Sequence, residues 1–258
     1  MEGIFQHFRE NERHFIEMVL EWKNVVEGQY RPKLTDFLDP REQWIVQSVI
    51  GHHHDVKVAF FGGSEHVERK RALLYPDYFA LGRDDFQLSV YEIDYPKKFV
   101  KLEHRQVLGS LMSLGVKRTK FGDILIEGDR IQVIVAKEIE SFVEMNFQEV
   151  GRTNVSLRKV NGDEVIETYD RFEERMTTTS SLRLDTVCSS IYNLSRQKTK
   201  PFIHNGDVKV NWKIVEDASF EVGEGDLISV RGFGRCKIQS IEGRTKKDKI
   251  KMIVGVQK

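Results

Sequence analysis

Residues 181–234 read SLRLDTVCSSIYNLSRQKTKPFIHNGDVKVNWKIVEDASFEVGEGDLISVRGFG, and this stretch decides the fold of the last third of the chain. Its first apolar side chains recur at three- and four-residue intervals, at Leu184, Val187, Ile191 and Leu194. This spacing predicts a helix with one buried stripe. Ser195 then stands where a second helix needs an N-cap. Pro201 removes a backbone donor inside that helix, so we expect it to be kinked or short.

The second half of the stretch predicts two strands and a basic loop. Asn205-Gly206 is a helix-stop and turn signal. Residues 208–211 alternate valines with polar side chains, as in a strand with one buried and one wet face. Gly225-Asp226 turns into a strand over 227–230, and the glycine-rich loop 231–235 that follows carries two arginines.

Charge is divided unevenly along a chain that is neutral overall. The 258 residues hold 40 basic and 40 acidic side chains. From Arg175 onward there are 16 lysines and arginines against 9 aspartates and glutamates, a balance of +7, which leaves 24 against 31, a balance of −7, for the rest. A basic tail on an acidic body favours a nucleic-acid partner, although a solvated charged surface gives the same count.

The tail resembles the S4-type RNA-binding domain, the αL motif. The resemblance is carried by Arg183-Leu184-Asp185, Ser195-Arg196, Ile203, Gly206, Val208, Val210-Asn211, Gly225-Asp226 and Val230-Arg231-Gly232. It implies that two helices and the following strand grip structured RNA. The implied contact residues are Arg183, Ser195, Arg196, Lys198, Lys200, Lys209, Asn211, Lys213, Arg231 and Arg235. We expect these residues to share one concave cationic strip.

The fold class predicted for the whole chain is α+β, with three domains. An N-terminal α/β unit covers residues 1–76, a ferredoxin-like (RRM-like) domain 77–170, a polar linker 171–181 and the S4-type domain 182–258. In the first unit we expect a helix over 4–27, a helix after the cap Asp39-Pro40, a strand over 56–61 and a helix over 65–74.

The middle domain has the ferredoxin-like order of elements. We expect a strand over 88–93, a helix over 105–114, a hairpin turning on Gly128-Asp129, a helix over 137–147 and a strand over 155–160. RNA-recognition domains of this order stack bases on sheet aromatics in two short motifs, and those motifs are absent here. Fold analogy alone therefore does not show that this domain binds RNA.

A second string makes the resemblance more specific. Residues 104–118, HRQVLGSLMSLGVKR, followed by Gly122-Asp123-Ile124 and preceded by Glu68-Arg69-Lys70-Arg71, resemble the bacterial YlmH family over essentially the full length. The resemblance implies a non-enzymatic, cytoplasmic, ribosome-associated protein. Its partners would be rRNA and tRNA on large subunits that carry peptidyl-tRNA, in translation rescue or quality control. A second RNA or ribosome contact is predicted at the ends of the middle-domain helix, at His104, Arg105, Lys117 and Arg118. The sequence fits equally well with these residues being the solvated ends of an ordinary core helix.

Several classes of protein are disfavoured by the sequence. No apolar run approaches the roughly 20 residues of a membrane span, and the charged N-terminus is unlike a secretory signal. Cys188 and Cys236 have no CxxC spacing and read as thiols of a reducing compartment, which favours the cytoplasm. His52-His53-His54 point in different directions on a helix and predict no metal site. Gly62-Gly63-Ser64 lacks the spacing of a nucleotide-binding loop. We expect the protein to bind no metal and no cofactor, and we expect it to be a monomer.

Two alternatives remain open. Residues 183–189, RLDTVCS, resemble the catalytic loop of pseudouridine synthases, although the closing Thr-Ser-Gly is replaced and the segment has helical periodicity. In the αL interpretation Asp185 is structural and caps or pairs locally. The other alternative is a cell-division adaptor whose partner is a protein.

Overall fold

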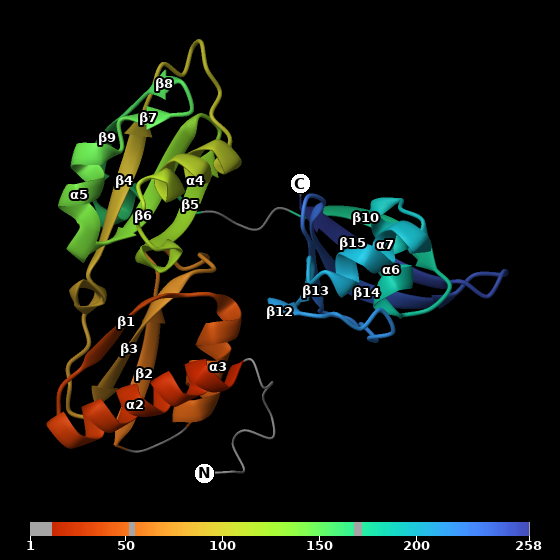
Figure 1. Ribbon diagram of the computed structural model, residues 1–258, viewed down its shortest axis with the longest axis horizontal. Helices are drawn as coiled ribbons and strands as arrows, with labels where there is room; N and C mark the ends of the chain where they lie inside the picture. The colour runs from red at the N-terminus through yellow and green to blue at the C-terminus, as the bar shows by residue number, and fades with distance from the viewer. Residues whose placement is uncertain (1–11, 52–54, 168–171, 258) are drawn as a thin grey trace. The chain divides into compact units, whose positions relative to one another are not determined.

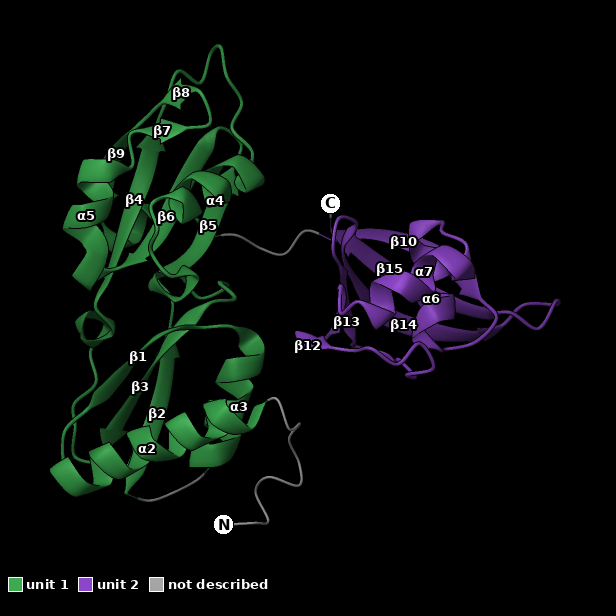
Figure 2. Cartoon of the chain, viewed as in Figure 1, with its two compact units in different colours: residues 1–169 green, residues 170–258 purple. Residues whose placement is uncertain are grey.

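The computed structural model describes residues 12–51, 55–167 and 172–257. It contains two compact units, Met1–Tyr169 and Asp170–Lys258 (Figure 2). Each unit has its own sheets and core, and each is described by itself.

The first unit begins with two helices on a three-stranded antiparallel sheet (Figure 1). Its elements are α2 (Arg13–Gln29), β1 (Lys33–Leu38), α3 (Pro40–Ile50), β2 (Val56–Phe61) and β3 (Lys70–Pro76), with strand order β1-β3-β2. The start at Asp39-Pro40 is confirmed: Asp39 accepts from the Glu42 amide at 2.9 Å, and Glu42 accepts from the Asp39 amide at 2.7 Å. The first predicted helix is present from Arg13 onward, and residues 4–11 lie outside the described residues.

The predicted helix over 65–74 is wrong, because residues 70–76 form the central strand β3. The string ERKRALL is rich in good helix formers. In the fold it pairs with β1 on one side and β2 on the other. Ala72 and Leu74 pack in the core with α2 and α3. Tertiary pairing outweighs the local preference, and β1 itself was not predicted.

The second part of this unit is the ferredoxin-like sheet. Its elements are β4 (Leu88–Asp94), α4 (His104–Ser113), β5 (Phe121–Glu127), β6 (Arg130–Ala136), α5 (Glu140–Asn146) and β9 (Ser156–Val160). The antiparallel order β5-β6-β4-β9 is that of the βαββαβ fold. Helix residues such as Val107, Leu111 and Val143 share a core with one face of the sheet. A short ribbon, β7 (Glu149–Val150) and β8 (Thr153–Asn154), lies between α5 and β9 in the chain.

The other face of this sheet is closed by apolar contacts from within the same unit. Phe37 of β1, Val67 and Ile166 form one buried cluster with side chains of β4, β5 and β6. Gly122 on β5 permits the approach, because a Cβ built there would lie 2.9 Å from the ring of Phe37. The two sheets of the first unit therefore share a core.

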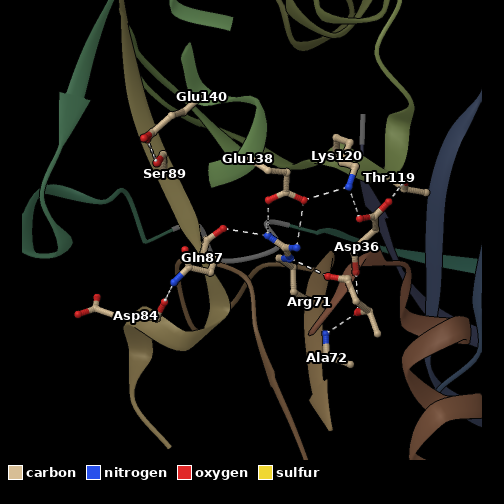
Figure 3. A network of polar contacts seen from close by, with 11 residues as sticks. Asp36, Arg71, Ala72, Asp84, Gln87, Ser89, Thr119, Lys120, Glu138 and Glu140 are labelled. Atoms are coloured by element: carbon tan, nitrogen blue, oxygen red, sulfur yellow. Dashed lines mark hydrogen bonds and ion pairs between the residues drawn. The ribbon is translucent and has the colours of Figure 1, made fainter. Parts of the chain in front are cut away.

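A buried arginine joins the same two sheets (Figure 3). The Arg71 side chain on β3 is 5 % exposed. Its guanidinium donates to the carbonyl oxygens of Thr35 at 2.7 Å and of Gln87 at 2.9 Å. It also donates to both carboxylate oxygens of Glu138, at 3.0 and 3.2 Å. Because Thr35 lies on β1 while Gln87 and Glu138 flank β4 and β6, this one side chain ties the sheets together.

Lys120 extends this network on its exposed side (Figure 3). Its ammonium group donates to Asp36 at 2.6 Å and to Glu138 at 2.9 Å. The Thr119 hydroxyl donates to the second oxygen of Asp36 at 3.0 Å. Asp36 on β1 and Glu138 are thus held by cations that come from both parts of the unit.

The second unit is a six-stranded antiparallel sheet with two helices. Its elements are β10 (Glu173–Thr179), α6 (Leu184–Tyr192), α7 (Arg196–His204), β11 (Val208–Val210), β12 (Lys213–Ile214), β13 (Leu227–Val230), β14 (Gly234–Arg244) and β15 (Ile250–Gln257), in the order β10-β15-β14-β13-β11-β12. The predicted linker 171–181 is wrong over residues 173–179, since β10 pairs along its whole length with β15. The polar run conceals a strand because its side chains are mostly exposed at the sheet edge.

Replacing Arg71 by methionine keeps the apolar stem and removes every one of its donors. We expect the free energy of unfolding of the first unit to fall by about 3 kcal/mol, because the buried Arg71 guanidinium is lost and leaves two carbonyl groups and the 41 % exposed Glu138 carboxylate without their donor. The denaturant dependence of hydrogen exchange in peptides from β1 and β3 measures this. Arg13→Met is the control, since the side chains of the Arg13–Glu17 ion pair are 66 % and 53 % exposed. Loss of this exposed pair should change the free energy of unfolding by under about 0.5 kcal/mol. Equal protection in the two variants would contradict the role given to Arg71.

Candidate nucleic-acid interface

A buried carboxylate organises the helical side of the second unit. Asp185, the second residue of α6, has no exposed side-chain surface. It accepts from Arg196 Nη2 at 2.7 Å and from Arg183 Nε at 3.3 Å. The Thr186 hydroxyl donates to it at 3.1 Å. The interpretation of Asp185 as a locally paired structural residue agrees with this geometry.

The two arginines reach Asp185 from the surface. Their side chains are 40 % exposed for Arg183 and 51 % exposed for Arg196. Burial opposes ionisation of Asp185, but the hydrogen bonds from Arg196, Arg183 and Thr186 outweigh it and hold the pKa of this carboxyl below its ordinary value. The carboxylate therefore fixes two guanidinium groups on side chains that stay partly exposed to solvent.

The second helix carries two further exposed cations. Ser195 caps α7 as predicted, since its hydroxyl accepts from the Lys198 amide at 3.3 Å. Lys198 and Lys200 are exposed, whereas Thr199 between them is buried. The helix continues to His204 beyond Pro201. Arg183, Arg196, Lys198 and Lys200 are called here the helical cation group.

Lys209 and Arg235 lie on a different face. Ser229 of β13 pairs with Lys209 of β11 and with Arg235 of β14, and directly opposed residues share one face of a sheet. The neighbours Val208, Val210 and Cys236 point into the core with α6 and α7. Lys209 and Arg235 therefore project from the face away from the helices. We expected all ten predicted residues to share a single strip. This expectation is wrong.

The remaining predicted residues of this unit lie in two turns and on the edge strand β12. The side-chain nitrogen of Asn211 donates to the Asp226 carboxylate at 2.8 Å, and its side-chain oxygen accepts from the backbone amide of Leu227 at 2.9 Å. Asn211 has a positive φ of 48°, a backbone region that asparagine tolerates. Arg231 donates to Asp207 at 3.3 Å but is 85 % exposed. Lys213, half-buried on β12, completes the set. Asn211 serves the fold, and Arg231 keeps an accessible charge.

The second predicted surface, in the first unit, is divided in the same way. His104 and Arg105 are exposed in the first turn of α4, and Lys117 is exposed after its end. Arg118 is not a surface group of this kind: it donates to the carbonyl oxygens of Phe121 at 2.6 Å and Gly122 at 3.1 Å.

The Arg118 side chain lies near Arg69 and Asp123, where the three-stranded and the four-stranded sheet of the first unit meet. Burial lowers its pKa to about 10, and the neighbouring Arg69 adds to this while Asp123 opposes it. Burial also disfavours the charged form of Asp123 and raises its pKa, although the backbone amides of Glu68 and Arg69 donate hydrogen bonds to its carboxylate. The two strings that carry the family resemblance in the first unit thus meet in the fold.

One exposed aromatic side chain was missed by the sequence prediction. Phe99 is 87 % exposed, the highest value among the large apolar side chains of the described residues. The signal that could have found it is the string Tyr95-Pro96-Lys97-Lys98-Phe99, which combines a turn former, cations and aromatics.

Within the described residues the structure offers no group of three His, Cys, Asp or Glu side chains that could hold a metal ion. His52-His53-His54 lie outside those residues. Cys188 and Cys236 are buried, and burial raises the pKa of both thiols to about 12. No helix among the described residues is long and apolar enough to cross a membrane.

Comparison with known proteins covers the whole chain. Residues 11–79 match the family model described as "YlmH, N-terminal", residues 82–164 the model "Putative RNA-binding domain in YlmH", and residues 182–228 the model "S4 domain". The Bacillus subtilis (strain 168) "Ribosome-associated protein quality control protein P2" is 49 % identical over 258 residues, which is 100 % of both chains. The solved structure "Cell division protein ylmH from Streptococcus pneumoniae" is 33 % identical with a TM-score of 0.55, covering 62 % of this chain and 98 % of that one.

Replacing Asp185 by asparagine should destabilise the second unit by about 1 to 3 kcal/mol at pH 7, since charged hydrogen bonds to two arginines are lost. A carboxyl whose pKa is lowered on folding contributes stability above its unfolded pKa of about 3.9 and loses it as pH falls through the folded value. The difference between wild type and Asp185→Asn should therefore shrink below about pH 4. Urea unfolding of this unit at several pH values measures it. Asp248→Asn, at an aspartate that is 83 % exposed, is the control, and a difference that stayed constant with pH would argue against the assigned charge state.

Proposed function

The chain belongs to the YlmH family, and on that premise we propose that it is a non-enzymatic RNA-binding protein that acts on the ribosome. We further propose that it binds rRNA and tRNA of large subunits that carry peptidyl-tRNA, in the cytoplasm and as a monomer, in rescue or quality control of blocked translation. The full-length relative, whose name places it in ribosome-associated quality control, supports this assignment.

The observation that carries the proposal is the fixed pair of guanidinium groups on Asp185. Arginine matches phosphate with a rigid fork of donors, and less entropy is lost when that fork is already oriented. Arg183 and Arg196 are oriented by a buried acceptor and stay half open to solvent. Lys198 and Lys200 add two exposed charges on the same helix as Arg196. This arrangement suits the backbone of a structured RNA better than a catalytic pocket.

The pseudouridine synthase alternative is disfavoured by the same geometry. A catalytic aspartate must reach its substrate, whereas Asp185 has no exposed surface and is bonded to two arginines. It also lies on a helix. The cell-division adaptor stays a second candidate because the solved relative from Streptococcus pneumoniae carries that name.

Two double variants test which face binds RNA, and each removes two exposed lysines. Lys198→Ala/Lys200→Ala removes charge from the helical cation group. Lys209→Ala/Lys237→Ala removes the same charge from the far face of the sheet, where Lys237 follows Arg235 by two residues. For labelled total tRNA, the first variant should reduce the slope of log K against log salt by roughly 1.5, since each phosphate contact contributes about 0.7 to 0.9.

The second double variant is the matched control and should leave that slope within error of wild type. Fluorescence anisotropy between 50 and 300 mM salt gives both slopes. An unchanged slope in Lys198→Ala/Lys200→Ala, or an equal loss in both variants, would contradict the assignment of the helical face.

Sedimentation of the tagged full chain through a sucrose gradient tests the ribosomal partner. We expect it to travel with the large-subunit fraction, with more protein bound when the subunits carry peptidyl-tRNA. Sequencing of the co-sedimenting RNA then identifies the element that is contacted. A chain that stays at the top of the gradient while binding a cell-division protein would favour the adaptor.

A further inference from the structure

The ferredoxin-like sheet has no face on which a base could stack. In RNA-recognition domains of this order, aromatic side chains on the open sheet face stack two or three bases. Here Val90, Glu92, Gln132 and Ile134 occupy that face, and each is between 0 % and 8 % exposed. Any RNA contact of this domain must therefore use another surface.

Other segments of the same unit cover this face of the sheet. Phe37 and Val67 cover one end of the face. At the other end, the buried Gln132 donates to the Glu164 carbonyl at 2.9 Å and accepts from the Ile166 amide at 2.8 Å. This holds the segment after β9 against the sheet. The face is thus occupied by the chain itself at both ends.

The segment that leaves β4 offers what the sheet face does not. Residues 95–105 read YPKKFVKLEHR and lead from β4 into α4. Phe99 stands in this segment with 87 % of its surface exposed. A singly exposed apolar side chain is common at protein surfaces, so the case for a partner rests on what surrounds this ring.

The position of Phe99 is fixed by the backbone around it. The Phe99 and Val100 amides both donate to the Pro96 carbonyl oxygen, at 2.9 and 3.1 Å. Leu102 is 3 % exposed in the domain core, and Val100 packs against that core. The ring is therefore presented on a turn that is anchored on both sides.

Charge complementarity indicates the partner. Lys97, Lys98, Lys101 and Arg105 lie within six residues of Phe99, against two acidic side chains, Asp94 and Glu103. Lys97 is 3.6 Å from Glu92, whereas Lys98, Lys101 and Arg105 are exposed. An exposed ring among cations fits a nucleotide whose base is unpaired, because the base stacks on the ring and its phosphates meet the cations.

We propose that the segment 95–105 is a second RNA-binding site, at which Phe99 stacks on an unpaired base while Lys98, Lys101 and Arg105 contact the flanking phosphates. This site rests on the proposed function in that RNA is the partner. It is separate from the helical cation group of the second unit and takes single-stranded rather than helical RNA.

The test uses the full chain carrying Lys198→Ala/Lys200→Ala, so that binding by the helical cation group is weakened. In this background Phe99→Ala should weaken affinity for a fluorescein-labelled oligo-adenosine 12-mer about 5- to 150-fold, the effect of losing one stacked base at about 1 to 3 kcal/mol. Affinity for a blunt 12-base-pair RNA duplex should stay unchanged. Phe99→Trp should bind the single strand at least as well as the parent, and Phe99→Leu should not restore it.

Phe142→Ala is the matched control, because Phe142 is an exposed aromatic of the same domain at 42 %. It should leave single-strand affinity unchanged. Single-strand affinity that is equal in Phe99→Ala and its parent, or fully restored by Phe99→Leu, would overturn the proposal, the second result indicating an apolar contact with a protein. If Phe99→Ala has no effect while Lys198→Ala/Lys200→Ala lowers the tRNA salt slope, the segment fails and the proposed function stands. If the reverse is found, the helical assignment fails and the segment stands.

Discussion

A charge that is removed from water must be paired, and in each unit of this protein one such charge fixes how neighbouring parts lie. In the first unit it is the cation Arg71, whose partners come from both sheets. In the second unit it is the anion Asp185, whose partners are surface arginines. The same physical rule has different consequences. Pairing of Arg71 fixes one sheet against another, whereas pairing of Asp185 fixes two cations at a surface that is open to solvent.

The junction around Arg71 also determines where the ferredoxin-like domain can act. Because β1 and its Phe37 are held beside the sheet, the face that related folds use for bases is part of the core. The fold class thus misdirects a search for the site. The available surface is the edge of the domain, where the chain between β4 and α4 has exposed cations and an exposed ring.

Local signals were sufficient wherever one residue type determines a local geometry. The Asp39-Pro40 helix start, the Ser195 cap and the order of elements between 88 and 160 could all be read from the sequence. The strand over 70–76 and the strand over 173–179 could not, because both exist through pairing with distant strands and their own residues favour a helix or a loop. The same limit applies to the site. That Lys209 lies on the far side of the sheet from Arg196 follows only from strand register, which no short window of sequence contains.

The neutral total charge has a role in this arrangement. A uniformly basic protein binds any polyanion, since most non-specific affinity comes from phosphate contacts. Here an acidic body compensates a basic tail, so the net charge of the chain gives no general attraction to polyanions. Two contacts on one chain need not be strong individually, because the first raises the effective concentration for the second. If both proposed sites bind RNA, selectivity comes from requiring structured RNA at the helical cation group together with an unpaired nucleotide at the segment around Phe99, a combination that a bare duplex or a simple single strand does not offer.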